Sequence, residues 1–335
     1  MIPTLKKKLK FRPDGTFHVL MISDFHGHDQ CSPQLKEGID ALVDATNPDL
    51  VLLGGDQLGA ATPERLHNYL ALVLKTIEER QIPWAHVYGN HDYEQPMTTE
   101  EQQPVYEAFP CCVSQRGPTD IHGVGNYVLP ILSSDETRVA WNVWALDSLR
   151  EYPDYQKAFN RPEYRFMLRN SFGIDSVQAS ALFDQVAWYY ETSRRMEAEQ
   201  GRRIPAIMYM HVPILEMLLI QRNPIECHME GTQRETIGSS ELSNGLYMAC
   251  QQRGDVKGIF FGHEHLNDFS GNLFGITMAY DSCVGYDMTT DDDMRGGREI
   301  ILNENDDSMT TRHIKLLALM GDRARRRYPK ILANY

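Results

Sequence analysis

The sequence lacks the features that mark several specialised protein classes. Its six cysteines are sparse for 335 residues, and no two have the spacing C-x-x-C, so we expect reduced thiols rather than a disulfide scaffold. No window reaches about 18 uninterrupted apolar residues, so we expect no membrane-spanning helix. We also find no internal repeat and no low-complexity linker. A single domain over residues 1–335 is therefore predicted, with a core at about 17–302 and a C-terminal strand and basic tail at 303–335.

The chain also lacks an excess of positive charge. Lysine and arginine number 33 against 46 acidic residues, which gives a net charge of −13. This balance disfavours nucleic acid as a partner, because nucleic-acid-binding proteins usually carry a basic surface. An anionic substrate is still possible, since bound metal ions reverse the local potential. The basic N-terminal decapeptide is not followed by the apolar segment of a signal peptide, so we expect a cytoplasmic protein without membrane contact.

The first ninety residues predict an alternation of strands and helices. The predicted strands are residues 17–23, 50–53 and 84–88, and the helices between them are residues 33–47 and 63–80. The continuous apolar run at 50–53 is typical of a strand that is buried on both faces. A β-α-β-α-β order predicts a largely parallel sheet covered by helices, in an α/β fold.

The remaining sequence predicts further strands separated by long polar segments. The expected elements are a hairpin at 125–147, a helix at 175–199, a strand at 204–210, a helix at 244–253, a strand at 256–261, and strands within 269–301 and 313–317. Long connections of this kind are usually functional or mobile. We expect the choice of substrate to come from the segments 94–124, 151–174, 216–240 and 279–293.

A short polar cluster follows the strand predicted at residues 84–88. Gly89 interrupts the apolar run, and Asn90, His91 and Asp92 come directly after it. Asparagine and histidine offer a neutral oxygen and an imidazole as ligands, and Asp92 could orient the imidazole or keep it protonated. Taken alone, this tetrad is also a good turn sequence. The interpretation of this tetrad as part of a functional site is supported by similar polar clusters after the other predicted strands.

Seven metal-ligand side chains occur at these strand ends, four of them histidines. They are Asp24, His26, Asp56, Asn90, His211, His263 and His265. Any single histidine could be an ordinary core or surface residue, but convergent polar groups at successive strand ends indicate a site. Mixed nitrogen and oxygen ligands suit Mn, Fe or Zn. Seven ligands exceed the needs of one tetrahedral ion, so two ions sharing one carboxylate are predicted. On extended backbone, each Asp/His-x-His pair would face one side.

These clusters, in this order, resemble the five sequence blocks of the calcineurin-like metallophosphoesterases. The nearer likeness is to the small branch related to purple acid phosphatases, carried by residues 254–257, 267–268 and 295–298. The resemblance implies a four-layer α/β/β/α sandwich with a dinuclear metal site between two sheets.

The resemblance also implies a role for each residue of the site. One metal would be bound by Asp24, His26, Asp56 and His265, and the other by Asp56, Asn90, His211 and His263. Asp56 would bridge the two ions. His91 would lie beside the phosphate as a proton donor or charge stabiliser, with Asp92 as its partner. Purple phosphatases carry a tyrosine ligand three residues after the bridging aspartate; this chain has Gly59 there, so ferric iron is not implied.

The function implied is metal-dependent hydrolysis of phosphate esters, with phosphomonoesters preferred and a metal-bound hydroxide as nucleophile. The substrate would be a phosphorylated small molecule or a phosphoprotein, and Tyr280, Tyr286 and Arg295 are candidates for contacting it. Two alternatives remain open at this point. One is a phosphodiesterase or nuclease of the same superfamily, which the negative charge disfavours. The other is a catalytically silent metal-binding scaffold, although all seven ligand residues and His91 are present.

Overall fold

The computed structural model describes residues 5–27, 33–57, 61–150, 180–240, 242–286 and 290–327. Gly59, the segment 151–174 and the predicted start of the helix at residue 175 lie outside these ranges. Within the described residues, no helix is both long and apolar enough to cross a membrane. The described cysteines are all buried and free, as expected for reduced thiols.

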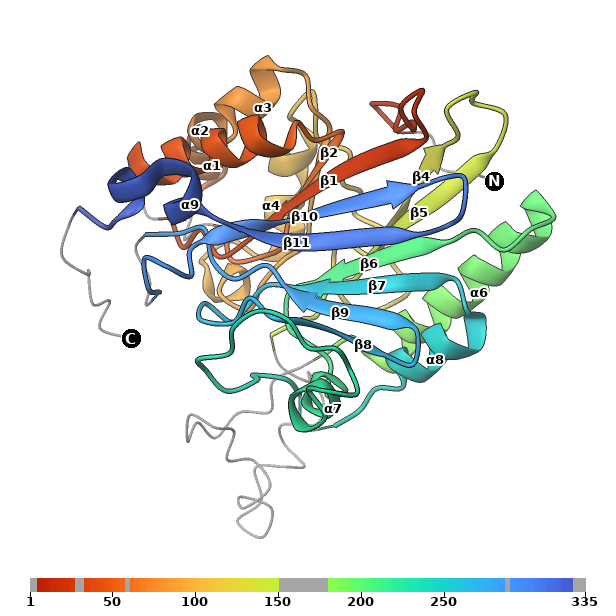
Figure 1. Ribbon diagram of the computed structural model, residues 1–335. Coiled ribbons are helices and arrows are strands. Elements are labelled where there is room, and N and C mark those ends of the chain that lie inside the picture. Colours follow the sequence, from red (N-terminus) through yellow and green to blue (C-terminus); the bar gives the residue numbers. More distant parts are fainter. Residues whose placement is uncertain are drawn as a thin grey trace, which may run out of the picture.

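Two sheets form the centre of the molecule (Figure 1). In the described residues, the first sheet has the order β11 (Met309–Lys315), β10 (Gly296–Asn303), β1 (Thr16–Ile22), β2 (Leu50–Leu53) and β3 (Trp84–His86). The second has the order β4 (Tyr127–Leu132), β5 (Val139–Ala145), β6 (Ala206–Met210), β7 (Val256–Phe261), β9 (Ile276–Tyr280) and β8 (Ser270–Leu273).

Both sheets are mixed, whereas the sequence predicted a largely parallel one. Strands β1, β2 and β3 are parallel as expected, but β10 and β11 continue the first sheet in antiparallel pairings. The second sheet has a parallel centre, β5-β6-β7-β9, with antiparallel edge strands β4 and β8. The C-terminal strands return to the N-terminal one, a long-range pairing that local periodicity does not encode.

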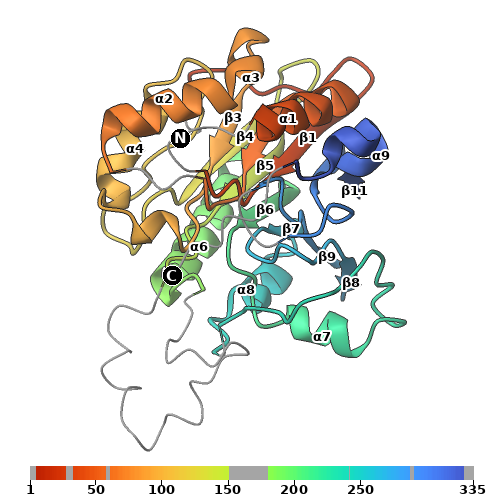
Figure 2. The same ribbon diagram turned by 90° about the vertical axis from the view of Figure 1, so that its left-hand side faces the viewer.

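Helices cover the outer face of each sheet and complete four layers, which confirms the expected α/β/β/α sandwich (Figure 2). The first sheet is covered by α1 (Pro33–Thr46), α2 (Pro63–Val73), α3 (Lys75–Glu79), α4 (Thr99–Glu107) and α9 (Leu316–Met320). The second sheet is covered by α6 (Phe183–Gln200), α7 (Met217–Arg222) and α8 (Leu246–Arg253).

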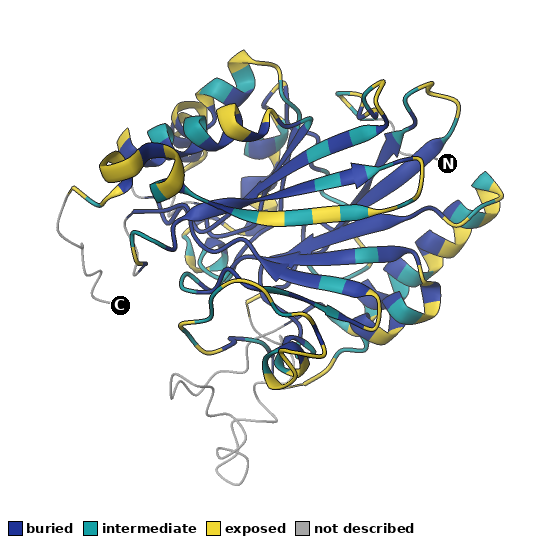
Figure 3. Ribbon diagram, viewed as in Figure 1, coloured by how far each residue is buried: buried dark blue, intermediate teal, exposed yellow. Residues whose placement is uncertain are grey.

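The central strands are buried on both faces because their side chains alternate between two cores (Figure 3). In β1, Leu20 and Ile22 pack against the helices, whereas Val19 and Met21 pack between the two sheets. Strand β7 behaves in the same way, with Phe260 between the sheets. This double burial explains why the strands are continuously apolar rather than alternating.

Several segments differ from the sequence prediction at their ends or in their interior. The helix predicted at residues 63–80 is broken at Leu74, whose ψ of 10° separates α2 from α3. The predicted loop at 94–124 contains α4, which begins with a capping box between Thr98 and Glu101, a readable start signal. The predicted loop at 216–240 contains α7. The last strand ends at Lys315, where α9 begins.

Burial between the sheets predicts that two phenylalanine-to-alanine substitutions lower the free energy of unfolding by different amounts. Phe260→Ala should lower the free energy of unfolding by about 3–5 kcal/mol, because a wholly buried ring leaves a cavity. Phe274→Ala removes the same atoms from a site that is 81% exposed and should change stability by less than about 0.5 kcal/mol. Urea unfolding monitored by circular dichroism measures both; equal losses would contradict the position of Phe260 in the core.

Candidate metal centre

The seven predicted ligand residues lie at one edge of the molecule, after the carboxyl ends of parallel strands. Asp24 and His26 follow β1, Asp56 follows β2, and Asn90 follows β3; His211 follows β6, and the remaining two histidines follow β7. The two sheets come together at this edge. A Cβ atom on Gly262, after β7, would lie 2.8 Å from Ser23 Oγ and 2.9 Å from the Gly54 carbonyl oxygen. Ligand-binding crevices occur at this edge in α/β folds.

The backbone of four of these residues has a left-handed conformation. The φ angles are 57° at Asp24, 44° at His26, 53° at Asp56 and 77° at His263. The expectation that Asp24-x-His26 and His263-x-His265 lie on extended backbone is therefore wrong. Sharp turns, rather than strand alternation, aim these side chains. Positive φ is costly for residues other than glycine, and such residues concentrate at functional sites.

Asp24, His26 and His265 form a first group of potential ligands, with one ligand atom of each lying within 4.8 Å of the others. His26 Nε2 lies 3.0 Å from His265 Nε2. His265 Nε2 is 3.2 Å from Asp24 Oδ1, and His26 Nε2 is 3.6 Å from the same oxygen. The nitrogens and the carboxylate oxygen therefore face a common point.

Asp56, His211 and His263 form a second group. His211 Nε2 lies 3.1 Å from Asp56 Oδ2 and 3.2 Å from the side-chain oxygen of Asn90. The other ring nitrogen of His211 is 2.8 Å from the Gly54 carbonyl oxygen, an acceptor that fixes the ring orientation. Asp56 Oδ2 is also 3.7 Å from His26 Nε2, so this carboxylate lies between the two groups.

The spacing and chemistry of these groups fit metal ions. Two ligands that are each about 2.1 Å from one ion lie about 3.0 Å apart at a right angle and about 3.4 Å apart at the tetrahedral angle. Two of the separations within the first group, 3.0 and 3.2 Å, lie in this range, and the third, 3.6 Å, is slightly longer. Asp24 Oδ1 is buried and accepts no hydrogen bond from the described residues. An unsatisfied carboxylate oxygen facing two imidazoles is a metal-ligand arrangement.

The protonation states of four side chains suit metal binding, which needs ionised carboxylates and neutral imidazoles. Burial raises the pKa of Asp24 and of Asp56, but the charge of His211 and contacts with other imidazoles outweigh it, so both pKa values lie below the usual one. Burial lowers the pKa of His26. Burial and the His211 charge together lower the pKa of His263 to about 3.

His211 provides the charge that balances the two buried carboxylates. Burial lowers the pKa of its imidazole, but the charges of Asp56 and Asp24 outweigh burial and raise the pKa to about 10. A metal ion would take over this positive charge and displace the proton. The cluster is therefore arranged around buried negative charge that requires cationic partners.

Asp92, the expected partner of His91, contacts backbone amides. Its buried carboxylate accepts hydrogen bonds from the backbone amides of Gly89, Asp56 and Gln57, at 2.8, 2.9 and 3.1 Å. Burial and the Asp56 charge raise the pKa of Asp92 to about 7, and the amide bonds oppose this shift. Asp92 thus holds together the turns that follow β2 and β3.

The carboxylate beside His91 belongs to Glu94, a residue that the sequence reasoning missed. His91 Nδ1 lies 2.6 Å from Glu94 Oε2. One ring nitrogen of His91 is also within 4.8 Å of the ligand atoms of His26 and Asp56. The i,i+3 spacing of His91 and Glu94 across a short turn was the available signal. His91 is therefore beside the cluster and also paired with a carboxylate.

Other side chains support Asp24 through hydrogen bonds, and no motif in the sequence indicated them. Ser23 Oγ bonds to the carboxylates of Asp24 and, at 2.8 Å, Asp281. Cys283 Sγ is 3.1 Å from the Asp24 carbonyl oxygen. The buried Glu264 accepts a bond from the Gly238 amide.

The residues suggested for substrate contact have structural roles instead. Tyr280 and Arg295 are wholly buried, and Tyr286 is nearly so. The Arg295 guanidinium stacks 4.0 Å from the centre of the Tyr286 ring and donates to the Gly285 carbonyl oxygen at 2.8 Å. A Cβ on Gly285 would lie 2.4 Å from the Asp24 carbonyl oxygen. Arg295 therefore supports the segment that packs against Asp24.

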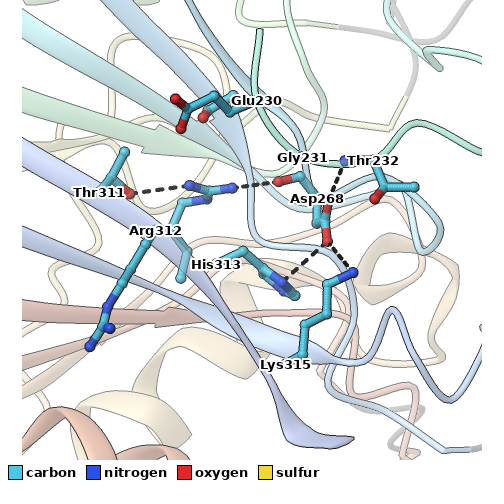
Figure 4. Close-up of a pocket in the computed structure, with 10 residues that line it drawn as sticks. Glu230, Gly231, Thr232, Asp268, Thr311, Arg312, His313 and Lys315 are labelled. Carbon is cyan, nitrogen blue, oxygen red and sulfur yellow. Dashed lines mark hydrogen bonds and ion pairs between the residues drawn. The ribbon is translucent and has the colours of Figure 1, made fainter. Parts of the chain in front are cut away.

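A cavity of about 270 Å³ lies between β8, β11 and the segment 230–232 (Figure 4). None of the seven ligand residues lines it. Two of its charged groups form ion pairs: Lys315 lies 3.0 Å from Asp268, and Arg312 lies 2.6 Å from Glu299. The buried Arg298 donates to the carbonyl oxygens of Tyr280 and Asp268. The cavity is therefore polar, and its Lys315, Arg312 and Arg298 side chains already have partners within the protein.

Comparisons with known proteins agree with this geometry. The family model described as calcineurin-like phosphoesterase matches residues 17–267. The chain is 28% identical over 316 residues to a protein of Arabidopsis thaliana named probable inactive purple acid phosphatase 14, covering 84% of this chain and 73% of that protein. It is 24% identical over 297 residues to phosphatase DCR2 of Saccharomyces cerevisiae, covering 80% of this chain and 47% of that protein.

A solved structure supports the fold. The dimetal phosphatase from Danio rerio superimposes with a TM-score of 0.53 at 13% identity, covering 88% of this chain and 98% of that one. At this identity the likeness concerns the arrangement of the sheets and helices. The four-layer architecture described above is therefore shared with a protein described as a dimetal phosphatase.

The close approach of Gly89 to Asp56 predicts the effect of one added methyl group. In Gly89→Ala the Cβ would lie 2.1 Å from Asp56 Oδ1 and 2.5 Å from the Asp56 amide nitrogen. The carboxylate must shift, and zinc affinity measured by titration calorimetry should fall at least about tenfold. Gly201→Ala, where no atom lies within 4 Å, is the control. It should cost about 1–2 kcal/mol of stability through its positive φ and leave zinc affinity unchanged.

Proposed function

Because this chain belongs to the calcineurin-like phosphoesterase family, we propose that it hydrolyses phosphate esters at a centre of two metal ions. The main support is the placement of Asp56, whose carboxylate lies 3.1 Å from His211 and 3.7 Å from His26. It therefore lies between two groups of potential ligands. A carboxylate in this position can serve both groups, which is the arrangement that a dinuclear site needs.

Each group of side chains has a distinct role in this proposal. Asp24, His26 and His265 would hold one ion, and Asn90, His211 and His263 would hold the other, with Asp56 shared between them. Such ions, Mn, Fe or Zn by ligand type, would supply Lewis-acid charge to hold the phosphate and activate water. Asp92 keeps the Asp56 and Gly89 turns in place through its three amide bonds.

His91 is the proposed proton donor to the leaving oxygen. One of its ring nitrogens lies within 4.8 Å of ligand atoms of His26 and Asp56, and its side chain is 29% exposed. The ring can therefore reach both the cluster and solvent. Proton donation by a histidine in this position matters most when the leaving group is a poor one.

The preferred substrate class is a phosphomonoester, on a small molecule or a phosphoprotein. The net charge of −13 disfavours a polyanionic nucleic acid, which a basic surface would be needed to bind. A phosphomonoester is small enough to be held by the two ions and His91 alone. The net negative charge of the protein then does not prevent binding of an anionic phosphate, because the ions determine the local charge.

A catalytically silent metal-binding protein is the competing function. Its support comes from relatives such as the one named probable inactive purple acid phosphatase 14. This chain retains seven potential ligands and His91 in one cluster, which favours activity. A substrate panel of p-nitrophenyl phosphate, its bis ester and an alkyl phosphate separates the functions. Hydrolysis of none of them by protein saturated with Mn, Fe or Zn would support the silent scaffold.

We expect two ions per chain after saturation, measured by elemental analysis. Asp56→Asn should reduce this to one or fewer, because an amide has a single neutral oxygen and cannot share negative charge between two ions. Asp322→Asn, at a side chain that is 94% exposed, is the matched control and should retain both ions. Two tightly bound ions in Asp56→Asn would contradict the shared position of Asp56.

Replacement of His91 tests its proposed role. His91→Ala should lower kcat on an alkyl phosphate by about 10²–10⁴-fold, the usual contribution of a general acid. The loss should be much smaller on p-nitrophenyl phosphate, whose leaving group needs little protonation. Metal content by elemental analysis should stay near that of the wild type. Loss of metal would identify His91 as a ligand, and full activity on the alkyl ester would exclude the acid role.

A further inference from the structure

A second carboxylate is directed toward His91 from within its own turn. Glu94 Oε2 lies 2.6 Å from His91 Nδ1, a short distance typical of a charge-assisted hydrogen bond. A carboxylate can only accept, so the proton of this bond is carried by Nδ1. The bond therefore identifies Nδ1 as the ring nitrogen that donates its proton to Glu94.

The local backbone creates this pair. Asp92–Glu94 forms a three-residue 3₁₀-helix with His91 as its N-terminal flanking residue. The Glu94 amide donates to the His91 carbonyl oxygen at 3.2 Å, and the Gln95 side chain donates to the same oxygen at 2.7 Å. Side chains three residues apart eclipse one another in a 3₁₀-helix. Glu94 is thus fixed directly beside the imidazole, and no long-range packing is needed to bring them together.

The second oxygen of Glu94 has its own partner. Glu94 Oε1 lies 3.3 Å from the Arg150 guanidinium. The carboxylate is therefore held on one side by Arg150 and on the other by His91. Its side chain is 30% exposed, and ion pairs at this exposure contribute little to stability. Because the contacts of Glu94 add little to stability, we explain them by their effect on the orientation of the His91 ring beside the metal cluster.

We propose that Glu94 is the positioning residue for His91, an inference that rests on the function proposed above. By accepting the Nδ1 proton, Glu94 fixes the ring orientation and leaves Nε2 as the nitrogen that serves the substrate. Asp92, the nearer carboxylate in sequence, is occupied by the amides of Gly89, Asp56 and Gln57. The two acids of this turn therefore have separate tasks: Asp92 holds the backbone and Glu94 holds the ring.

The test compares Glu94→Ala and Glu94→Gln with wild type in metal-saturated protein. Glu94→Ala should lower kcat on an alkyl phosphate about ten- to a hundredfold, with KM and metal content nearly unchanged, because orientation rather than binding is lost. Glu94→Gln keeps an oxygen acceptor and should lose less. Glu100→Gln is the matched control. Glu100 also pairs with an arginine, Arg116, but lies outside the proposed site, and its replacement should leave kcat unchanged.

A double mutant distinguishes positioning from structural damage. If Glu94 acts through His91, Glu94→Ala should cause no further loss in a protein that already carries His91→Ala. Damage to the fold would instead lower activity equally in both backgrounds and overturn the proposal. Nitrogen NMR of the zinc-loaded protein gives a readout without turnover: His91 Nδ1 should be protonated in the wild type and should lose this single tautomer in Glu94→Ala.

The outcomes separate this inference from the proposed function. If wild-type protein hydrolyses none of the phosphate esters, the proposed function fails, and the NMR measurement alone decides whether Glu94 orients the ring. If wild-type protein is active and Glu94→Ala keeps full kcat on the alkyl phosphate, the positioning role is wrong while the function stands. An unprotonated Nδ1 in the wild type would also overturn the proposal.

Discussion

The negative charge of Asp56, buried where the two sheets meet, is the constraint on which the site depends. Burying a carboxylate costs several kcal/mol unless partners compensate for it. Here the compensation comes from His211 at 3.1 Å and from the His91 amide at 2.8 Å. These partners can approach Asp56 only because Gly55 and Gly89 have no side chain. A Cβ on Gly55 would lie 2.4 Å from His211 Nδ1, and one on Gly89 would lie 2.1 Å from the Asp56 carboxylate.

Much of the fold could be predicted from the sequence because each central strand is a short apolar run that ends in a polar cluster. Residues 19–22 and 50–53 are buried on both faces, which makes them continuously apolar and easy to recognise. Since parallel strands present their carboxyl ends at one edge, the convergence of Asp24, Asp56 and Asn90 follows from the strand order alone. Their grouping within one site needed no knowledge of side-chain geometry.

The remaining features depend on contacts that local patterns do not contain. The pairing of β10 with β1 joins residues 277 to 287 positions apart, and nothing in either segment specifies its antiparallel direction. The positive φ angles at Asp24, His26 and His263 arise because the chain must turn sharply to bring side chains from two sheets together. Such strain persists only where the surrounding structure over-determines it, so it could not be read from these residues themselves.

The turn from Gly89 to Glu94 shows why proximity in sequence was a poor guide to partnership. Asp92 is adjacent to His91, but consecutive side chains of a helical turn do not face one another. Its carboxylate instead satisfies three buried amides, which would otherwise lack acceptors in a region that excludes water. Glu94, one 3₁₀ turn further on, lies on the same side as the imidazole. The conformation of the turn, rather than the order of residues, therefore assigns one acid to the backbone and the other to the ring.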